Sequence, residues 1–130
     1  MRVLRLPSNP RNLALIDDFV KNICRRYSVR SDKHGDMLIS LTEAVTNAII
    51  HGNNRDESKQ VQIQLSKKPD SISFMVSDEG RGFDYQSLPD PTSPDNRCKC
   101  GGRGVYLMRC LSDQMEFHDN GRTVEMRFKI

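Results

Sequence analysis

The chain has 130 residues, enough for one domain with a single hydrophobic core, and nothing in its composition argues for a second domain. Its 20 Lys and Arg residues against 17 Asp and Glu residues leave a net charge of +3, too small and too dispersed to predict direct binding to nucleic acid. No run approaches the roughly 18 apolar residues of a membrane span, and the N-terminus lacks the apolar stretch of a signal peptide. The four cysteines include no Cys-x-x-Cys pair, so we expect reduced thiols and a soluble, cytoplasmic protein.

Two helices are predicted in the first half of the chain. Asn9 can cap a helix and Pro10 can occupy its first position. Apolar residues then recur at intervals of three and four up to about residue 27, which is the pattern of one buried helix face. A second helix should begin at residue 31 or 32 and end near residue 52, where we expect His51 to interact with the helix dipole.

Strands are predicted where the apolar period changes to two. A short strand candidate covers residues 3–6, and residues 61–65 and 72–76 alternate between apolar and polar side chains, with a turn at residues 69–70. Periodicity then disappears in residues 78–104, where eight of the 27 residues are Gly or Pro. A loop of that length inside a compact domain is expected to have a function or to be disordered.

The C-terminal part predicts a third helix over roughly residues 104–111 and a terminal hairpin. Its strands are residues 115–117 and 124–130, joined by a turn at residues 120–121. Each strand has one apolar face and each helix one apolar stripe. This favours an α+β fold, a two-layer α/β sandwich in which helices cover one face of a mostly antiparallel, mixed sheet.

Glu43 and Asn47 are the most informative residues of the chain. They are polar residues one helical turn apart in otherwise apolar surroundings, so both should project from the same helix face. Burying a carboxylate and an amide there would be costly unless a ligand or a metal ion satisfied them. The segment therefore predicts a binding site.

Two glycine motifs follow. Asp78 stands at the end of a predicted strand, directly before Gly80 and Gly82, where a ligand can approach the backbone closely. Gly102 and Gly104 precede the third helix, where backbone N–H groups can bind an anion such as phosphate. Each motif alone also fits a plain turn or a helix cap.

The three motifs, in this order, resemble the N, G1 and G2 boxes of the GHKL, or Bergerat-fold, ATPases. Within that superfamily the chain is most similar to the anti-sigma-factor serine/threonine kinases of the RsbW and SpoIIAB type. The similarity lies in residues 42–52 (Thr-Glu-Ala-Val-Thr-Asn-Ala-Ile-Ile-His-Gly), 78–84 (Asp-Glu-Gly-Arg-Gly-Phe-Asp) and 102–108 (Gly-Arg-Gly-Val-Tyr-Leu-Met). It implies one histidine-kinase-like ATPase domain over residues 1–130, with a mobile ATP lid at about residues 84–104.

The resemblance implies a role for each matching residue. Asn47 would coordinate a Mg²⁺ ion that bridges the ATP phosphates, and Glu43 would act as a base toward the attacking serine hydroxyl. Asp78 would accept a hydrogen bond from the adenine amino group, and Gly80 and Gly82 would let the base lie against the backbone. The structural alternatives remain open: Asn47 as an amide bonded to backbone, and Glu43 as a helix-surface acid paired with a basic neighbour.

Further residues are implied in the same way. Gly102, Arg103 and Gly104 would bind the phosphates, and Thr123, at the start of the last strand, would help to bind adenine. Thr123 is also explained as an ordinary strand residue. In the sporulation branch of the family a basic residue stands where this chain has Cys100, so a nearby cation would have to supply that charge.

The implied partners are a STAS-domain anti-anti-sigma protein, as the phosphorylation substrate, and a sigma factor, which the chain would sequester. ATP and Mg²⁺ would be the cofactors, and a homodimer is expected because members of this family are usually dimers. The alternative is a non-catalytic, ATP-dependent binding module that regulates another partner. Glu43 favours the kinase.

Overall fold

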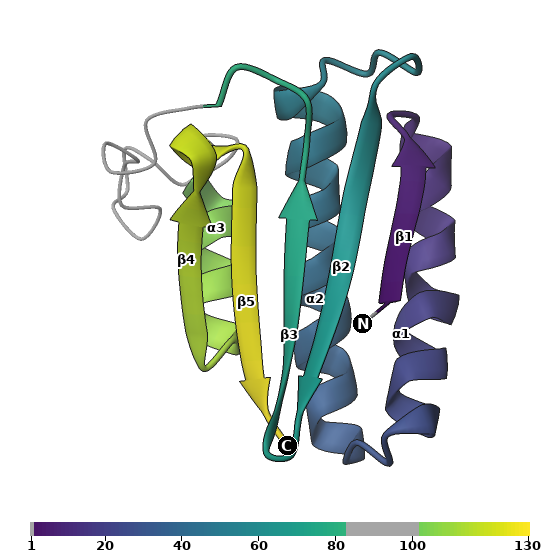
Figure 1. Cartoon of the computed structure of the whole chain (residues 1–130), viewed down its shortest axis with the longest axis vertical. Coiled ribbons are helices and arrows are strands. Elements are labelled where there is room, and N and C mark those ends of the chain that lie inside the picture. The colour runs from purple at the N-terminus through teal and green to yellow at the C-terminus, as the bar shows by residue number, and fades with distance from the viewer. Residues whose placement is uncertain (1, 83–101) are drawn as a thin grey trace.

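The computed structural model describes residues 2–82 and 102–130, of which residues 102 and 103 are described by their backbone alone. The elements in chain order are β1 (Arg2–Pro7), the 3₁₀ turn η1 (Pro10–Leu13), α1 (Ala14–Arg26), α2 (Ser31–Asn47), the π-helical turn η2 (Ala48–Gly52), β2 (Gln60–Lys68), β3 (Ser71–Ser77), α3 (Gly102–Leu111), β4 (Gln114–His118), the 3₁₀ turn η5 (Asp119–Gly121) and β5 (Thr123–Lys129). The strands form one sheet in the order β1-β2-β3-β5-β4 (Figure 1). Each of the four pairings between these described strands is antiparallel, and the predicted α+β class is confirmed.

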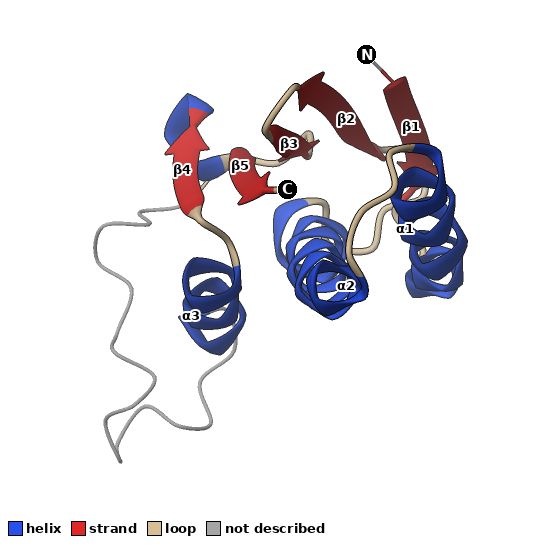
Figure 2. Ribbon diagram, turned by 90° about the horizontal axis from the view of Figure 1, so that it is seen from below, coloured by secondary structure: helices blue, strands red, loops and turns tan. Residues whose placement is uncertain are grey.

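The molecule has two layers, as the one-sided apolar patterns predict. Figure 2 shows α1, α2 and α3 against one face of the sheet, with the other face open. In β2, for example, Val61, Ile63 and Leu65 are at most 1% exposed, whereas the alternating Gln62 and Gln64 are only half-buried. The period of two therefore decides which side chains meet the helices.

The helix ends differ from the simple periodic prediction. Asn9 caps as expected, since its Oδ1 accepts a hydrogen bond from Arg11 N–H at 2.9 Å, but the first turn after it is the 3₁₀ turn η1. At the other end, α2 continues without a break into η2, where Asn53 N–H donates to the Ala48 carbonyl at 2.8 Å. This is the wider i→i+5 bond of a π turn, a feature that often occurs at functional sites.

Two hairpins bring the functional segments together. Both predicted turns are confirmed: Lys68 pairs with Ser71 across the first, and β4 and β5 flank the second. Because β5 also pairs with β3, the end of β3 lies beside the start of β5, where Asp78 N–H donates to the Arg122 carbonyl at 3.0 Å. This neighbour relationship positions Asp78.

Phe74 occupies the centre of the core. It is fully buried, and its ring makes edge contacts with Phe19 of α1 and Phe128 of β5, with centroids 6.4 and 6.0 Å apart. Edge-to-face pairs at such distances stabilise beyond the area they bury. The three rings join the helix layer to two neighbouring strands.

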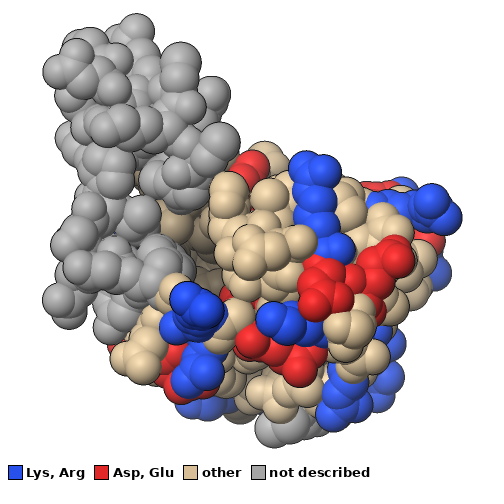
Figure 3. Space-filling model, turned by 90° about the horizontal axis from the view of Figure 1, so that it is seen from above, with Lys and Arg blue, Asp and Glu red and all other residues tan. Residues whose placement is uncertain are grey.

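The surface seen in Figure 3 carries acidic and basic side chains side by side, as the small net charge predicts. Exposed ion pairs such as Lys21–Asp17 (2.9 Å) contribute little to stability, because solvent screens them. In the part of the chain that the structure describes, no helix is both long enough and apolar enough to span a bilayer.

Candidate functional site

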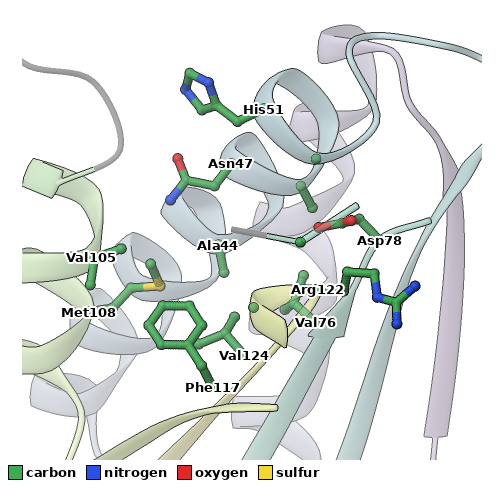
Figure 4. A pocket seen from close by; sticks show the side chains of 14 residues that line it. Ala44, Asn47, His51, Val76, Asp78, Val105, Met108, Phe117, Arg122 and Val124 are labelled. Carbon is green, nitrogen blue, oxygen red and sulfur yellow. The ribbon is translucent and has the colours of Figure 1, made fainter. Parts of the chain in front are cut away.

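A cavity of about 220 Å³ opens between α2, α3 and the adjoining ends of β3 and β5. In Figure 4, Asn47 and His51 project from successive helical turns, Asp78 and Arg122 lie across the cavity from them, and Phe117 stands at the apolar end. A mostly apolar cavity with a few converging polar groups is typical of a ligand site. The lining residues are Ala44, Asn47, Ala48, His51, Gly52, Val76, Asp78, Gly82, Val105, Met108, Phe117, Gly121, Arg122 and Val124.

Glu43 and Asn47 lie on the face of α2 that meets the start of α3. Asn47 lines the cavity, whereas Glu43 is not among the lining residues. Gly104 lies against both: a Cβ added to it would stand 2.8 Å from Glu43 Oε2 and 3.4 Å from Asn47 Nδ2. α3 therefore approaches the predicted pair at a residue that has no side chain.

Both side chains are half-buried and not fully enclosed. Among the described residues, neither has a hydrogen-bond partner, so Asn47 is not bonded to backbone and Glu43 is not paired with a basic neighbour there. An amide and a carboxylate without such partners are available to a ligand or a substrate.

Asp78 is held in a close-fitting backbone cradle. Its Oδ1 accepts a hydrogen bond from Gly80 N–H at 2.8 Å. A Cβ added to Gly52 would stand 2.4 Å from Asp78 Oδ2, and a Cβ added to Gly80 would stand 2.1 Å from the Gly52 carbonyl oxygen. Glycine at both positions is thus required by steric contact.

Burial raises the pKa of the Asp78 carboxyl above its ordinary value, and this effect outweighs the opposing effects of the Gly80 hydrogen bond and the positive Arg122. A half-buried carboxyl with a raised pKa inside a cavity is a candidate functional group. Within the described residues Oδ2 has no hydrogen-bond donor, so one carboxyl oxygen remains available.

Gly82, the second glycine of the motif, also lines the cavity. Its φ of +83° belongs to the left-handed region, and a Cβ there would stand 2.1 Å from the carbonyl oxygen of Asn120 in the β4–β5 turn. A side chain is excluded both by the dihedral angle and by the neighbouring backbone.

The predicted phosphate-binding residues Gly102, Arg103 and Gly104 form the first turn of α3, which begins two residues earlier than the sequence pattern suggests. The side chain of Arg103 and the greater part of the predicted lid, residues 84–101, lie outside the described residues. The structure thus places the backbone of this motif beside Glu43 and Asn47.

Thr123 pairs with Ser77, the residue before Asp78, but it does not line the cavity. Its hydroxyl is 2.9 Å from that of Ser77, its partner in the β3–β5 register. Since Val124 faces the helices, the alternation of the strand directs Thr123 to the other face of the sheet. Its predicted contact with adenine stays a prediction.

Among the lining residues that the sequence does not assign to a site, three have polar or aromatic side chains. The sequence predicts an interaction of His51 with the helix dipole, but its position four residues after Asn47 also places it on the same helix face, where it lines the cavity. Arg122 and Phe117 come from the C-terminal hairpin and have no sequence signal of their own. Arg122 is also anchored by an ion pair from its Nη2 to Asp119 Oδ1 at 2.7 Å.

The described residues contain one cluster with three metal-ligand side chains, Glu116, His118 and Glu125. It lies on the open face of the sheet and is not the predicted Mg²⁺ site. His118 Nε2 is 3.0 Å from Glu125 Oε1 and 3.9 Å from Glu116 Oε2, distances of an ordinary ion pair when the imidazole is protonated.

The fold and the site define a member of a known class. Residues 6–128 match the histidine kinase-like ATPase domain, and the chain belongs to this family. The sequence resemblance to GHKL ATPases is thereby confirmed.

Among curated relatives, the serine-protein kinase RsbW of Bacillus subtilis (strain 168) is 29% identical over 130 residues, which cover 95% of this chain and 81% of that protein. The serine-protein kinase RsbW of Oceanobacillus iheyensis is 24% identical over 122 residues, covering 89% and 77% respectively. The protein of the same name from Bacillus licheniformis is 29% identical over 130 residues, with coverage of 95% and 81%.

Proposed function

We propose that this chain is a protein serine/threonine kinase that uses ATP and Mg²⁺ and acts as an anti-sigma factor in the cytoplasm, where ATP is available. The observation that carries this proposal is the packing of Gly104 against Glu43 and Asn47, beside a cavity that reaches Asp78. The similarity to relatives named serine-protein kinase supports the same activity.

The adenine base would occupy the cavity. Asp78 would accept a hydrogen bond from the amino group through Oδ2, because Oδ1 is already bonded to Gly80 N–H. Gly80 and Gly82, which have no side chains, would let the base lie against the backbone. At about 220 Å³ the cavity suits the base and not the whole nucleotide, since pockets that enclose a drug-sized ligand measure roughly 300–1,000 Å³.

The phosphates would lie at the start of α3. Gly102, Arg103 and Gly104 supply backbone N–H groups at a helix N-terminus, which attract anions. Asn47 offers a side-chain oxygen, the ligand type that Mg²⁺ prefers, and it has no competing partner among the described residues. The ion would neutralise phosphate charge and orient the γ-phosphate.

Glu43 would accept the proton of the attacking serine or threonine hydroxyl. The hydroxyl oxygen forms a bond to the γ-phosphorus, the bond from that phosphorus to the β,γ-bridging oxygen breaks, and ADP leaves. Because Glu43 and Asn47 share one rigid helix face, the base and the anchor of the phosphates keep a constant separation. Such positioning is the main contribution of a protein to phosphoryl transfer.

The substrate that we propose is a STAS-domain anti-anti-sigma protein, and the second partner is a sigma factor that the chain sequesters. The chain would act as a homodimer. These assignments are supported by the resemblance of residues 42–52, 78–84 and 102–108 to that group of kinases.

The test compares the wild type with Glu43→Ala and Asn47→Ala. Each protein is incubated with Mg²⁺, labelled ATP and a candidate STAS-domain protein from the same genome, and phosphoserine is measured together with the Kd for ATP by titration calorimetry. Asn47→Ala is expected to lose both binding of Mg-ATP and transfer. Glu43→Ala is expected to keep its Kd and to lose about 10²- to 10⁴-fold in transfer rate.

Two results would change the proposal. Normal transfer by Glu43→Ala would show that Glu43 is not the base. ATP-dependent binding of a partner without any transfer by the wild type would favour the alternative function, a non-catalytic binding module.

A further inference from the structure

Asn53 is a buried polar residue in a segment that otherwise faces solvent. Its side chain is 0% exposed, whereas residues 54–58 directly after it are exposed. Every residue of the segment 53–58 is polar, a composition that is typical of a solvent-exposed turn. An amide that is fully buried must have its hydrogen bonds made within the protein.

The side chain of Asn53 bonds to three segments, two of which are distant from it in sequence. Its Oδ1 accepts a hydrogen bond from Glu79 N–H at 2.8 Å. Its Nδ2 donates to Ser8 Oγ at 2.8 Å and to the Gln60 carbonyl at 3.1 Å. These partners also determine the orientation of the amide, because a backbone N–H requires the oxygen and a carbonyl requires the nitrogen.

The bond from Glu79 N–H to Asn53 is one of three backbone hydrogen bonds that hold the segment around Asp78 in place. Three consecutive N–H groups are bonded there: that of Asp78 to the Arg122 carbonyl, that of Glu79 to Asn53, and that of Gly80 to Asp78 Oδ1. The first bond is to the residue that precedes β5, and the third is to the side chain of Asp78 itself. Only the middle bond ties this segment to the end of the helix that carries Asn47.

The end of the α2–η2 helix and the segment from Asp78 to Gly80 are packed too closely to move relative to one another. Gly52, the residue before Asn53, is in steric contact with the Asp78 carboxyl, and Gly80 is in contact with the Gly52 carbonyl. Ser8 is also 0% exposed, and its Oγ donates to the Lys59 carbonyl at 2.6 Å, which anchors the group to the start of β2. A shift of Glu79 would therefore move Asp78 relative to the cavity wall.

We propose that Asn53 is a positioning residue for base recognition: through Glu79 N–H it holds the Asp78 carboxyl at the place where that carboxyl selects the adenine amino group. This inference rests on the proposed function, in which Asp78 binds adenine. Asn53 does not line the cavity and acts through Asp78 alone.

The test measures the preference of the protein for ATP over an analogue without the amino group, and not only its affinity for ATP. The Kd values for ATP and for purine riboside triphosphate, which lacks the 6-amino group, are determined with Mg²⁺ for the wild type and Asn53→Ala. A hydrogen bond to a charged acceptor predicts that the wild type prefers ATP by about 10- to 100-fold. Asn53→Ala is expected to lose most of this preference, through weaker binding of ATP and unchanged binding of the analogue.

Ser8→Ala is the matched control. It removes one bond to Asn53 and the bond to Lys59 but leaves the bond between Asn53 and Glu79 in place. It should lower the melting temperature and keep the full preference for ATP. Because the preference is a ratio measured on one preparation, a fraction of unfolded protein cancels from it. If Asn53→Ala does not fold, Asn53→Ser replaces it, since one hydroxyl cannot make all three bonds of the amide.

The outcomes separate the two hypotheses. A wild type without preference for ATP would contradict the assignment of Asp78 to adenine, and with it the present inference. A wild type and an Asn53 variant with the same preference would overturn the positioning role while leaving the adenine site intact. A preference that is lost in the Asn53 variant and kept in Ser8→Ala supports the inference.

Discussion

Gly104 and Glu43, 61 positions apart in the chain, are in such close contact that a Cβ added to the glycine would stand 2.8 Å from Glu43 Oε2. The contact joins the first turn of α3 to the helix face that also carries Asn47. It brings the predicted phosphate-binding backbone next to the predicted base. Since the atom in the way is the end of a flexible side chain, an added methyl group would displace Glu43 more readily than the backbone.

We therefore expect Gly104→Ala to affect phosphoryl transfer and not stability. Alanine favours a helix over glycine by roughly 0.5–1 kcal/mol, so the free energy of unfolding should not fall. Displacement of the base should lower the transfer rate by about 10- to 100-fold. Urea unfolding and the phosphorylation assay measure the two effects.

Gly35→Ala is the control, because nothing lies within 4 Å of a Cβ at this exposed position of α2. Gly35→Ala should raise the free energy of unfolding by roughly 0.5–1 kcal/mol and leave the rate of phosphoryl transfer unchanged. A Gly104→Ala protein with wild-type transfer would show that Glu43 tolerates displacement or is not the base.

Asp78→Asn should stabilise the free protein while weakening ATP binding. Burial raises the pKa of the Asp78 carboxyl, so the folded state binds its proton more tightly than the unfolded chain. The wild type therefore loses stability as pH rises from the ordinary aspartate pKa of about 4 through the raised folded value. Asparagine does not titrate, and the advantage of the variant should grow over the same pH window and then level off.

Thermal unfolding of both proteins without nucleotide, from about pH 4 to pH 8, measures this difference. The Kd for ATP at neutral pH should rise by about 10- to 100-fold in the variant, because the charged acceptor is lost. A stability difference that is constant with pH would mean that Asp78 is not desolvated in the folded state.

Gly82→Ala should destabilise the fold itself. Its φ of +83° alone costs a residue with a side chain about 1–3 kcal/mol. The contact with the Asn120 carbonyl oxygen adds to this cost, since backbone cannot move aside as a side chain can. Urea unfolding at one pH is sufficient to measure it, and a loss no greater than that of an exposed surface substitution would contradict the contact.

Phe74→Ala should cost about 3–5 kcal/mol, the range for removal of a buried aromatic ring. The residue is 0% exposed and its ring contacts Phe19 and Phe128. Phe74→Leu keeps most of the volume and should cost less than half as much. Equal losses for the two variants would show that volume does not determine the packing at this site.

Local patterns were sufficient to predict most elements of the fold. The apolar periods of α1 and β2 report which face of each element is buried, and Pro69 with Asp70 and Asn120 with Gly121 mark both hairpin turns. Glu43 and Asn47 could be placed on one face because helix geometry relates residues four apart without any knowledge of the rest of the chain.

Contacts between distant segments could not be predicted in this way. The placement of β5 between β3 and β4 is not encoded in any single strand, yet it places Arg122 beside Asp78. Asn53 bonds Ser8 across 45 residues and Glu79 across 26, and in sequence it resembles the exposed polar residues that follow it. A buried polar residue in a turn cannot be distinguished from an exposed one by sequence, because burial depends on its partners in space.

The sequence by itself determined the element types, the two-layer class and the identity of the chemical groups, because period, turn chemistry and residue type act over a few positions. Tertiary structure decided which groups share one site. It placed Gly104 against Glu43 and Gly52 against Asp78, and it brought Asn53 into hydrogen-bond contact with Glu79 N–H. The physical reason is that steric fit and hydrogen bonding between segments depend on distances in space, which arise only when the strands pair and the helices pack on the sheet.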